Sequence, residues 1–148
     1  MSQQRRPESF AIGVDGPRTK QSGERDMLCR MMFSPPSDEV LFTDYSCALK
    51  QTMLLHGRMF LTNRHVCFYS NLFGFEKKLV IPMESVTRIS KGTTLKMLSN
   101  AVRVFTRDNA DGYFFTSFWG KYRDECFGIL QRCVLTRTLP VPLSRGVF

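Results

Sequence analysis

Residues 53–70, MLLHGRMFLTNRHVCFYS, carry the pattern that decides the fold. Apolar side chains and one glycine occupy the odd positions of 53–61, with Arg58 among the even positions between them. This period of two predicts a strand with one buried face. Asn63 favours a turn, and residues 65–70 return as a second strand rich in β-forming side chains. The stretch therefore predicts two neighbouring antiparallel strands.

Short strands of the same kind are predicted on both sides of this pair. Pro82 and Gly92 end two of them, because proline and glycine interrupt regular strands. The sequence NADG at 109–112 favours a hairpin turn, since Asp-Gly tolerates positive φ. The further strands are expected at residues 45–50, 76–81, 86–91, 101–106 and 113–118. Seven short strands at this spacing predict an all-β sandwich or barrel.

The hydrophobic period changes after residue 118. Apolar side chains then recur at steps of three and four, with charged residues between them, which predicts one amphipathic helix over about 120–135. The helix is expected to plug the open end of the barrel, with Trp119 buried in the core. The predicted fold class is mainly β with one C-terminal α-helix, a pleckstrin-homology-like seven-stranded open barrel capped by that helix.

The two ends of the chain have a different composition. Residues 1–36 are predicted to form a flexible N-terminal arm, because the first part of the arm holds too little apolar mass to offset its ordering entropy. One domain is expected over 37–135. Residues 136–148 contain two prolines and are predicted to form a C-terminal tail.

Composition narrows the function classes. The chain has 148 residues, with 21 Lys and Arg against 13 Asp and Glu, so its net charge of +8 favours an anionic partner. No apolar run approaches the roughly 20 residues that a membrane-spanning helix needs, and residues 1–10 show no secretory signal. The five cysteines have no C-x-x-C spacing, which predicts neither a zinc site nor a disulfide framework and favours a reducing cytoplasm.

Several motifs occur in an order typical of one family. They are YSCALKQ at 45–51, HGRMFLT at 56–62, VCFYSN at 66–71 and KLVIP at 78–82. Residues 37–134 resemble a GRAM domain, in particular those of the Aster and Lam sterol transporters at membrane contact sites. The resemblance implies a pleckstrin-homology-like fold that docks on anionic lipid, either phosphatidylserine or a phosphoinositide. In those transporters a separate domain carries the sterol, so the resemblance does not imply sterol transfer here.

Basic side chains are the candidates for contact with lipid headgroups. Lys and Arg bind phosphate or carboxylate oxygens through charge-assisted hydrogen bonds, and strand alternation or loop position is expected to expose a subset of them. Such a residue contributes only about 1 kcal/mol at an anionic surface, so a second contribution is needed. The predicted lipid-binding residues are Lys77, Lys78, Arg88, Lys91, Lys96 and Arg103.

The loop at 71–75 is expected to supply that second contribution. Leu72 and Phe73 are the candidates for insertion into a membrane, whereas Phe75 and Leu98 are expected to fold back into the core because exposed apolar clusters are a liability. The predicted function is a cytoplasmic, peripheral membrane-targeting module that binds anionic lipid headgroups through a basic surface patch.

Other functions are less consistent with the sequence. A protein-interaction module on the same scaffold is the alternative, because this fold can bind peptides along a sheet edge. Nucleic acid is not expected, since no RNP motif is present and the aromatic residues mostly occupy buried positions. His65 and Cys67 share one strand face, but a Cys–His nucleophile also needs an orienting group and an oxyanion hole. Cys29 is the most reactive thiol expected. No catalytic residue, metal ligand or cofactor is predicted, and no enzyme activity is expected.

Overall fold

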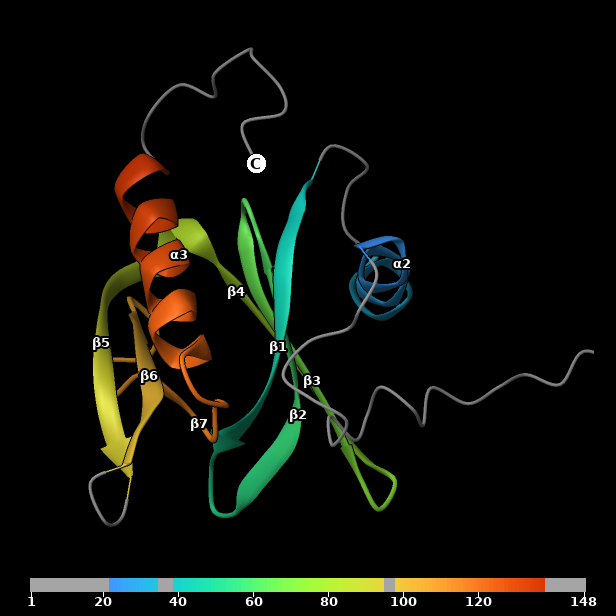
Figure 1. The fold of residues 1–148 in the computed structure, drawn as a ribbon, viewed down its shortest axis with the longest axis horizontal. Helices are drawn as coiled ribbons and strands as arrows, with labels where there is room; N and C mark the ends of the chain where they lie inside the picture. The colour runs from blue at the N-terminus through green and yellow to red at the C-terminus, as the bar shows by residue number, and fades with distance from the viewer. Residues whose placement is uncertain (1–21, 35–38, 95–97, 138–148) are drawn as a thin grey trace, which may run out of the picture.

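The computed structural model describes residues 22–34, 39–94 and 98–137 (Figure 1). These residues form one sheet of seven antiparallel strands in the order β4-β3-β2-β1-β7-β6-β5. All the predicted strands are present. Their bounds are Leu41–Lys50 for β1, Leu54–Thr62 for β2, His65–Leu72 for β3, Phe75–Pro82 for β4, Val86–Thr94 for β5, Leu98–Thr106 for β6 and Tyr113–Thr116 for β7, with a short 3-10 turn at Met83–Ser85 before β5.

The sheet curls into a half-barrel that helix α3, Tyr122–Thr136, closes on the inner side. The helix packs across β5 and β6. Its position confirms the predicted C-terminal helix that caps the barrel. Alternation directs one set of side chains from every strand inward, because successive residues of a strand point to opposite faces. The main core consists of these inward side chains and the apolar stripe of α3, including Tyr45, Phe68, Phe115, Cys126 and Leu130.

A second helix, α2 at Ser22–Phe33, lies in the region that the sequence assigned to a flexible arm. Its apolar side chains cover the outer face of β2 and β3, where Cys29 packs with Phe60, Cys67 and Tyr69 in a separate buried cluster. The rings of Phe33 and Phe60 meet edge to face at 5.9 Å. The arm prediction rested on the composition of the first 26 residues, and it overlooked the apolar residues further along that anchor this helix, Leu28, Cys29, Met32 and Phe33.

Gly57 marks a close approach between β2 and β3. A Cβ atom at this position would lie 2.1 Å from the carbonyl oxygen of Tyr69 and 2.9 Å from the Cα of Ser70. No real side-chain carbon fits at such a distance, so only glycine allows the two backbones to pass here. The same approach lets the Ser70 hydroxyl donate a hydrogen bond to the carbonyl of His56 at 2.7 Å.

Candidate functional site

The turn between β3 and β4 presents two phenyl rings to solvent. Phe73 is 99% exposed and Phe75 is 82% exposed, so the expectation that Phe75 folds back is wrong. Leu72 pairs with Phe75, which leaves Phe73 and Gly74 as a two-residue hairpin turn with φ of 53° and 83°. A left-handed backbone costs a residue with a side chain about 1–2 kcal/mol. Phe73 therefore has an unfavourable backbone conformation and also exposes a large apolar side chain to water.

Other exposed apolar side chains lie at the same end of the sheet. Because the strands reverse direction in turn, the β1–β2 and β3–β4 turns share one end, which is the lower end in Figure 1. The β2–β3 pairing ends at Arg58 and Tyr69, so the two turns extend separately beyond it at this end. We name this end the apolar rim, and its members are the exposed side chains of Met53, Leu54, Phe73, Phe75 and Trp119.

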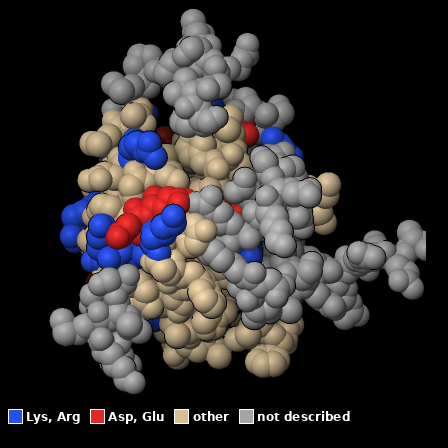
Figure 2. Space-filling view, in the orientation of Figure 1, with Lys and Arg blue, Asp and Glu red and all other residues tan. Residues whose placement is uncertain are grey.

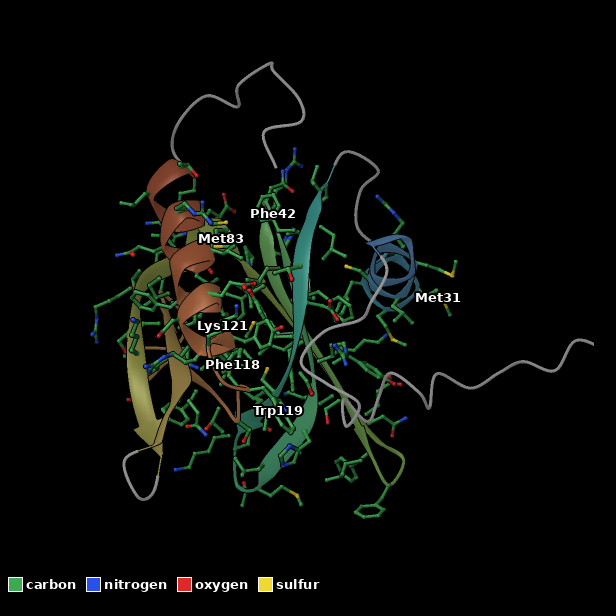
Figure 3. All side chains as sticks on the ribbon, viewed as in Figure 1. Met31, Phe42, Met83, Phe118, Trp119 and Lys121 are labelled. Atoms are coloured by element: carbon green, nitrogen blue, oxygen red, sulfur yellow. The ribbon has the colours of Figure 1, made fainter. Side chains whose placement is uncertain are left out.

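Trp119 belongs to the apolar rim and not to the core. It is 58% exposed, and Figure 3 shows it in the β7–α3 connection, toward the end that carries the β1–β2 turn. The neighbouring Phe118 is buried instead and meets Tyr45 edge to face at 5.9 Å. Ser117 and Gly120 both have positive φ, so the connection is not helical at this point. Helix α3 begins only at Tyr122, so the prediction that Trp119 belongs to its buried stripe is wrong.

Three lysines flank the apolar rim. Lys77 and Lys78 follow the β3–β4 turn on the edge strand β4, and as successive residues they point to opposite faces of it. Lys77 is half-buried on the face that carries the core, whereas Lys78 is exposed beside Tyr69. Lys50 is exposed at the end of β1. Sequence reasoning missed Lys50, although its place directly before the predicted β1–β2 turn was a usable signal.

Lys91 lies on β5, and its side chain pairs with an acidic residue of α3. Its Nζ is 3.1 Å from Oδ1 of Asp124, which also accepts a hydrogen bond of 2.7 Å from Nε of Arg123. The hydrogen bonds from Lys91 and Arg123 hold the pKa of the Asp124 carboxyl below its ordinary value. Figure 2 shows acidic and basic side chains intermixed on this side of the molecule. The charge of Lys91 is therefore compensated within the domain.

Arg88 and Arg103 lie together on the outer face of β5 and β6. The guanidinium carbon of Arg88 is 3.9 Å from the centroid of the Phe105 ring, and that of Arg103 is 5.9 Å from the same ring. Sheet order places β5 and β4 at opposite edges. The structure thus divides the predicted basic residues into the Lys77–Lys78 pair, the Arg88–Arg103 pair and Lys91, while Lys96 lies outside the described residues.

The thiols of the domain are buried. Burial raises the pKa of the Cys47, Cys67, Cys126 and Cys133 thiols above the ordinary value. Cys29 lies on the face of α2 that packs against the sheet and is buried there, which does not favour the expectation that it is the most reactive thiol. The Nδ1 of His65 lies 2.8 Å from Oε2 of the buried Glu39. These surroundings favour neutral thiols, not a Cys–His nucleophile.

The helices of the described ranges include none that is long and apolar enough to cross a membrane. Within the same ranges, His, Cys, Asp and Glu side chains form no group of three or more that could hold a metal ion.

A model of the GRAM domain family matches residues 28–138. The chain belongs to the GRAM domain family. It is 40% identical to human Aster-A over 121 residues, which covers 78% of this chain and 16% of Aster-A. It is 39% identical over 84 residues to an uncharacterized membrane protein of Schizosaccharomyces pombe, a match that covers 57% of this chain and 11% of that protein. The chain thus spans a small part of these relatives.

Solved structures confirm the pleckstrin-homology-like fold of this GRAM domain. The C-terminal domain of an unknown protein from Leishmania infantum superimposes with a TM-score of 0.64 at 29% identity, covering 74% of this chain and 97% of that domain. The N-terminal PH domain of human ARAP2 gives a TM-score of 0.54 at 14% identity, covering 78% and 96%. The GRAM family is one of membrane- and lipid-binding modules, which are generally not catalytic.

Proposed function

We propose that this GRAM domain is a cytoplasmic, peripheral membrane-targeting module that inserts its apolar rim into a bilayer and binds anionic headgroups through the flanking lysines. The observation that carries the proposal is Phe73, which is 99% exposed in a left-handed backbone conformation. An apolar side chain at such a position gains free energy only when another apolar phase covers it. The membrane association implied by the name of the S. pombe relative supports the same assignment.

Ring burial and lysine attraction both contribute to the free energy of membrane binding. Burying Phe73 and Phe75 would contribute roughly 3–6 kcal/mol, and three lysines near an anionic leaflet would add about 3 kcal/mol. Together these reach roughly the micromolar range, whereas the lysines alone would give millimolar binding or weaker. We therefore propose that Lys50, Lys77 and Lys78 select anionic lipid, phosphatidylserine or a phosphoinositide, and that the rings supply most of the affinity.

The position of the rim limits which predicted residues reach lipid. Arg88 precedes the end of β5 by six residues, which at strand rise is about 20 Å from the end that carries the rim. Arg88 therefore stays outside a bilayer that the rim enters. Lys91 is paired with Asp124 and offers little charge to a headgroup. Lys96 stays a predicted headgroup contact.

Vesicle co-sedimentation tests this proposal. We expect binding to vesicles of phosphatidylcholine with phosphatidylserine or phosphoinositide, weaker binding to phosphatidylcholine alone, and weaker binding at high salt. The double variant Phe73→Ser and Phe75→Ser should bind roughly a hundredfold to ten-thousandfold more weakly, because it loses the apolar contribution. The matched control is Met27→Ser and Met31→Ser, which removes two exposed apolar side chains from α2 and should bind like the wild type.

Trp119 provides a second readout without any substitution, because it is the single tryptophan of the chain. Its fluorescence should shift to shorter wavelength when anionic vesicles are added, since the ring moves from water into the interface. Equal binding to anionic and neutral vesicles would refute the role of the lysines. Unchanged binding of the Phe73 and Phe75 double variant would refute insertion of the rim.

A further inference from the structure

The outer face of the sheet between β5 and β1 carries a row in which cations alternate with phenyl rings. The members in spatial order are Arg88, Phe105, Arg103, Phe114 and Lys50, and we name this set the cation–ring row. Phe105 lies between the guanidinium groups of Arg88 and Arg103, at 3.9 and 5.9 Å from its centroid. Phe114 lies between Arg103 at 4.7 Å and Lys50 at 5.8 Å.

Strand register and small residues build this row. Arg88 pairs with Phe105 across β5 and β6, and Arg103 pairs with Phe114 across β6 and β7, so each cation stands beside a ring on the same face. A Cβ at Gly92 would lie 2.9 Å from the Phe114 ring, which means that the edge atoms of the ring pack closely against the glycine. A Cβ at Gly112 would lie 2.8 Å from Cγ of Arg103. The side chains are therefore held in place by close packing.

The charges of the row are not compensated by carboxylates. In the described part of the chain, no Asp or Glu lies within ion-pair distance of Arg88, Arg103 or Lys50. Arg103 donates to the backbone carbonyl of Asp111 at 2.8 Å, a contact that leaves its charge in place. Lys91, on the opposite face of β5, differs from these residues because its Nζ lies 3.1 Å from Oδ1 of Asp124.

We propose that the cation–ring row docks an acidic protein segment rich in Asp and Glu. A guanidinium group that lies over a ring, as Arg88 does over Phe105, can direct its N–H edge to a ligand, and this planar fork matches a carboxylate with two parallel hydrogen bonds. Arg103 uses one N–H at the Asp111 carbonyl and has others to offer. Single-stranded nucleic acid fits less well, because base stacking needs an uncovered aromatic face and both rings already lie beneath cations.

The arginine part of the row also lies away from the proposed bilayer contact, and only Lys50 is shared between the two. The side chains of the row stand perpendicular to the sheet, whereas the apolar rim lies at the strand ends, and Arg88 lies at the end of β5 remote from the rim. A domain docked through its rim would keep Arg88 and Arg103 available. The inference goes beyond membrane binding, because Arg88 and Arg103 form a second surface that can be occupied at the same time, whereas Lys50 is shared with the proposed bilayer contact.

Fluorescence anisotropy with a labelled oligoglutamate peptide tests the row. The wild type should bind, and the double variant Arg88→Gln and Arg103→Gln should bind roughly tenfold more weakly. The control Lys121→Gln and Arg132→Gln removes the same charge from exposed positions at α3 and should bind like the wild type. Arg88→Lys and Arg103→Lys keeps the charge without the fork and should bind with intermediate affinity.

Three outcomes would overturn the inference. The first is no binding of oligoglutamate to the wild type, or equal weakening by both Gln variants, which would mean diffuse charge attraction. The second is tighter binding of single-stranded oligothymidylate that the Arg variants abolish. The third is displacement of oligoglutamate by phosphatidylserine vesicles, which would make the row a bilayer contact. Vesicle binding of the Arg88 and Arg103 Gln variant should equal that of the wild type, so this inference and the proposed membrane function can fail separately.

Discussion

The outer face beneath α2 and the apolar rim are both formed by aromatic side chains of neighbouring strands, yet only the first is closed. Phe60 and Tyr69 are buried under α2, whereas Phe73 and Phe75 lie in solvent a few residues further along the same chain. Helix α2 covers one apolar surface and leaves the other open. The difference indicates that exposure of the rim is a feature of the connections at one end of the sheet and not a general shortage of apolar cover.

This contrast separates two kinds of mutational effect. Changes at the covered face should lower the free energy of unfolding, because they remove contacts made within the domain. Changes at the rim should alter binding to vesicles and leave the free energy of unfolding almost unchanged, because the rim side chains make few contacts in the free domain. The exception is a residue at position 73 that tolerates the left-handed backbone better.

Phe60→Ala is expected to have the largest effect. Phe60 is fully buried between the sheet and α2, so its truncation should lower the free energy of unfolding by about 3–5 kcal/mol. Urea denaturation measures this change, and Phe73→Ala is the matched control, with an expected change within about 0.5 kcal/mol. If the two variants lost similar stability, the distinction between the covered face and the open rim would be wrong.

Gly57→Ala should have the next largest effect, because the added carbon would collide with the Tyr69 carbonyl at 2.1 Å. The collision should force β2 and β3 apart and lower the free energy of unfolding by about 1–3 kcal/mol. Because Gly57 lies on β2 between the cluster under α2 and the rim, the substitution should weaken vesicle binding as well. Thermal unfolding measures the first effect. Gly128→Ala in α3 is the control, since nothing lies within 4 Å of its Cβ, and it should stabilise the helix by up to about 1 kcal/mol.

Phe73→Asn should raise stability while it weakens membrane binding. Asparagine tolerates the left-handed backbone with φ of 53° better than phenylalanine does, so the free energy of unfolding should increase by roughly 1 kcal/mol. Vesicle affinity should fall, because one inserting ring is lost. Chemical denaturation and co-sedimentation on the same protein measure the two effects. A variant that loses both stability and binding would show that Phe73 packs within the domain.

Lys91→Gln should have the smallest effect on vesicle binding, because the charge of Lys91 is already paired with Asp124. The measurable consequence of this substitution is a change in the pKa of Asp124. The pKa of Asp124 should rise toward its ordinary value when a hydrogen-bond donor is lost, which carboxyl NMR detects. A lowered carboxyl pKa stabilises the fold above the unfolded-state pKa, and that contribution is lost as pH falls through the folded-state pKa. The variant should therefore show a weaker loss of stability on the acid side.

The strands and the C-terminal helix were predictable, because each depends on a local period of side chains. Residues 53–61 alternate, and residues 122–133 recur at helical steps, whatever their tertiary neighbours. Helix α2 was harder to predict, since its apolar residues are few and it is stabilised mainly by the sheet beneath it. Phe73 was named as an insertion candidate from its place in a turn, and its insertion stays a prediction. Phe75 was assigned to the core because exposed apolar clusters are a liability, and Trp119 because of its helical spacing.

The sequence by itself determined the class of fold, the family and an excess of positive charge, because these depend on residue order and composition. Only the tertiary structure decided which cations are paired and which surfaces stay open. Lys91 and Arg88 lie on one short strand, but alternation and the packing of α3 place the first beside Asp124 and the second on the ring of Phe105. Such contacts join residues that are distant in sequence, so the register and the curl of the sheet determine them.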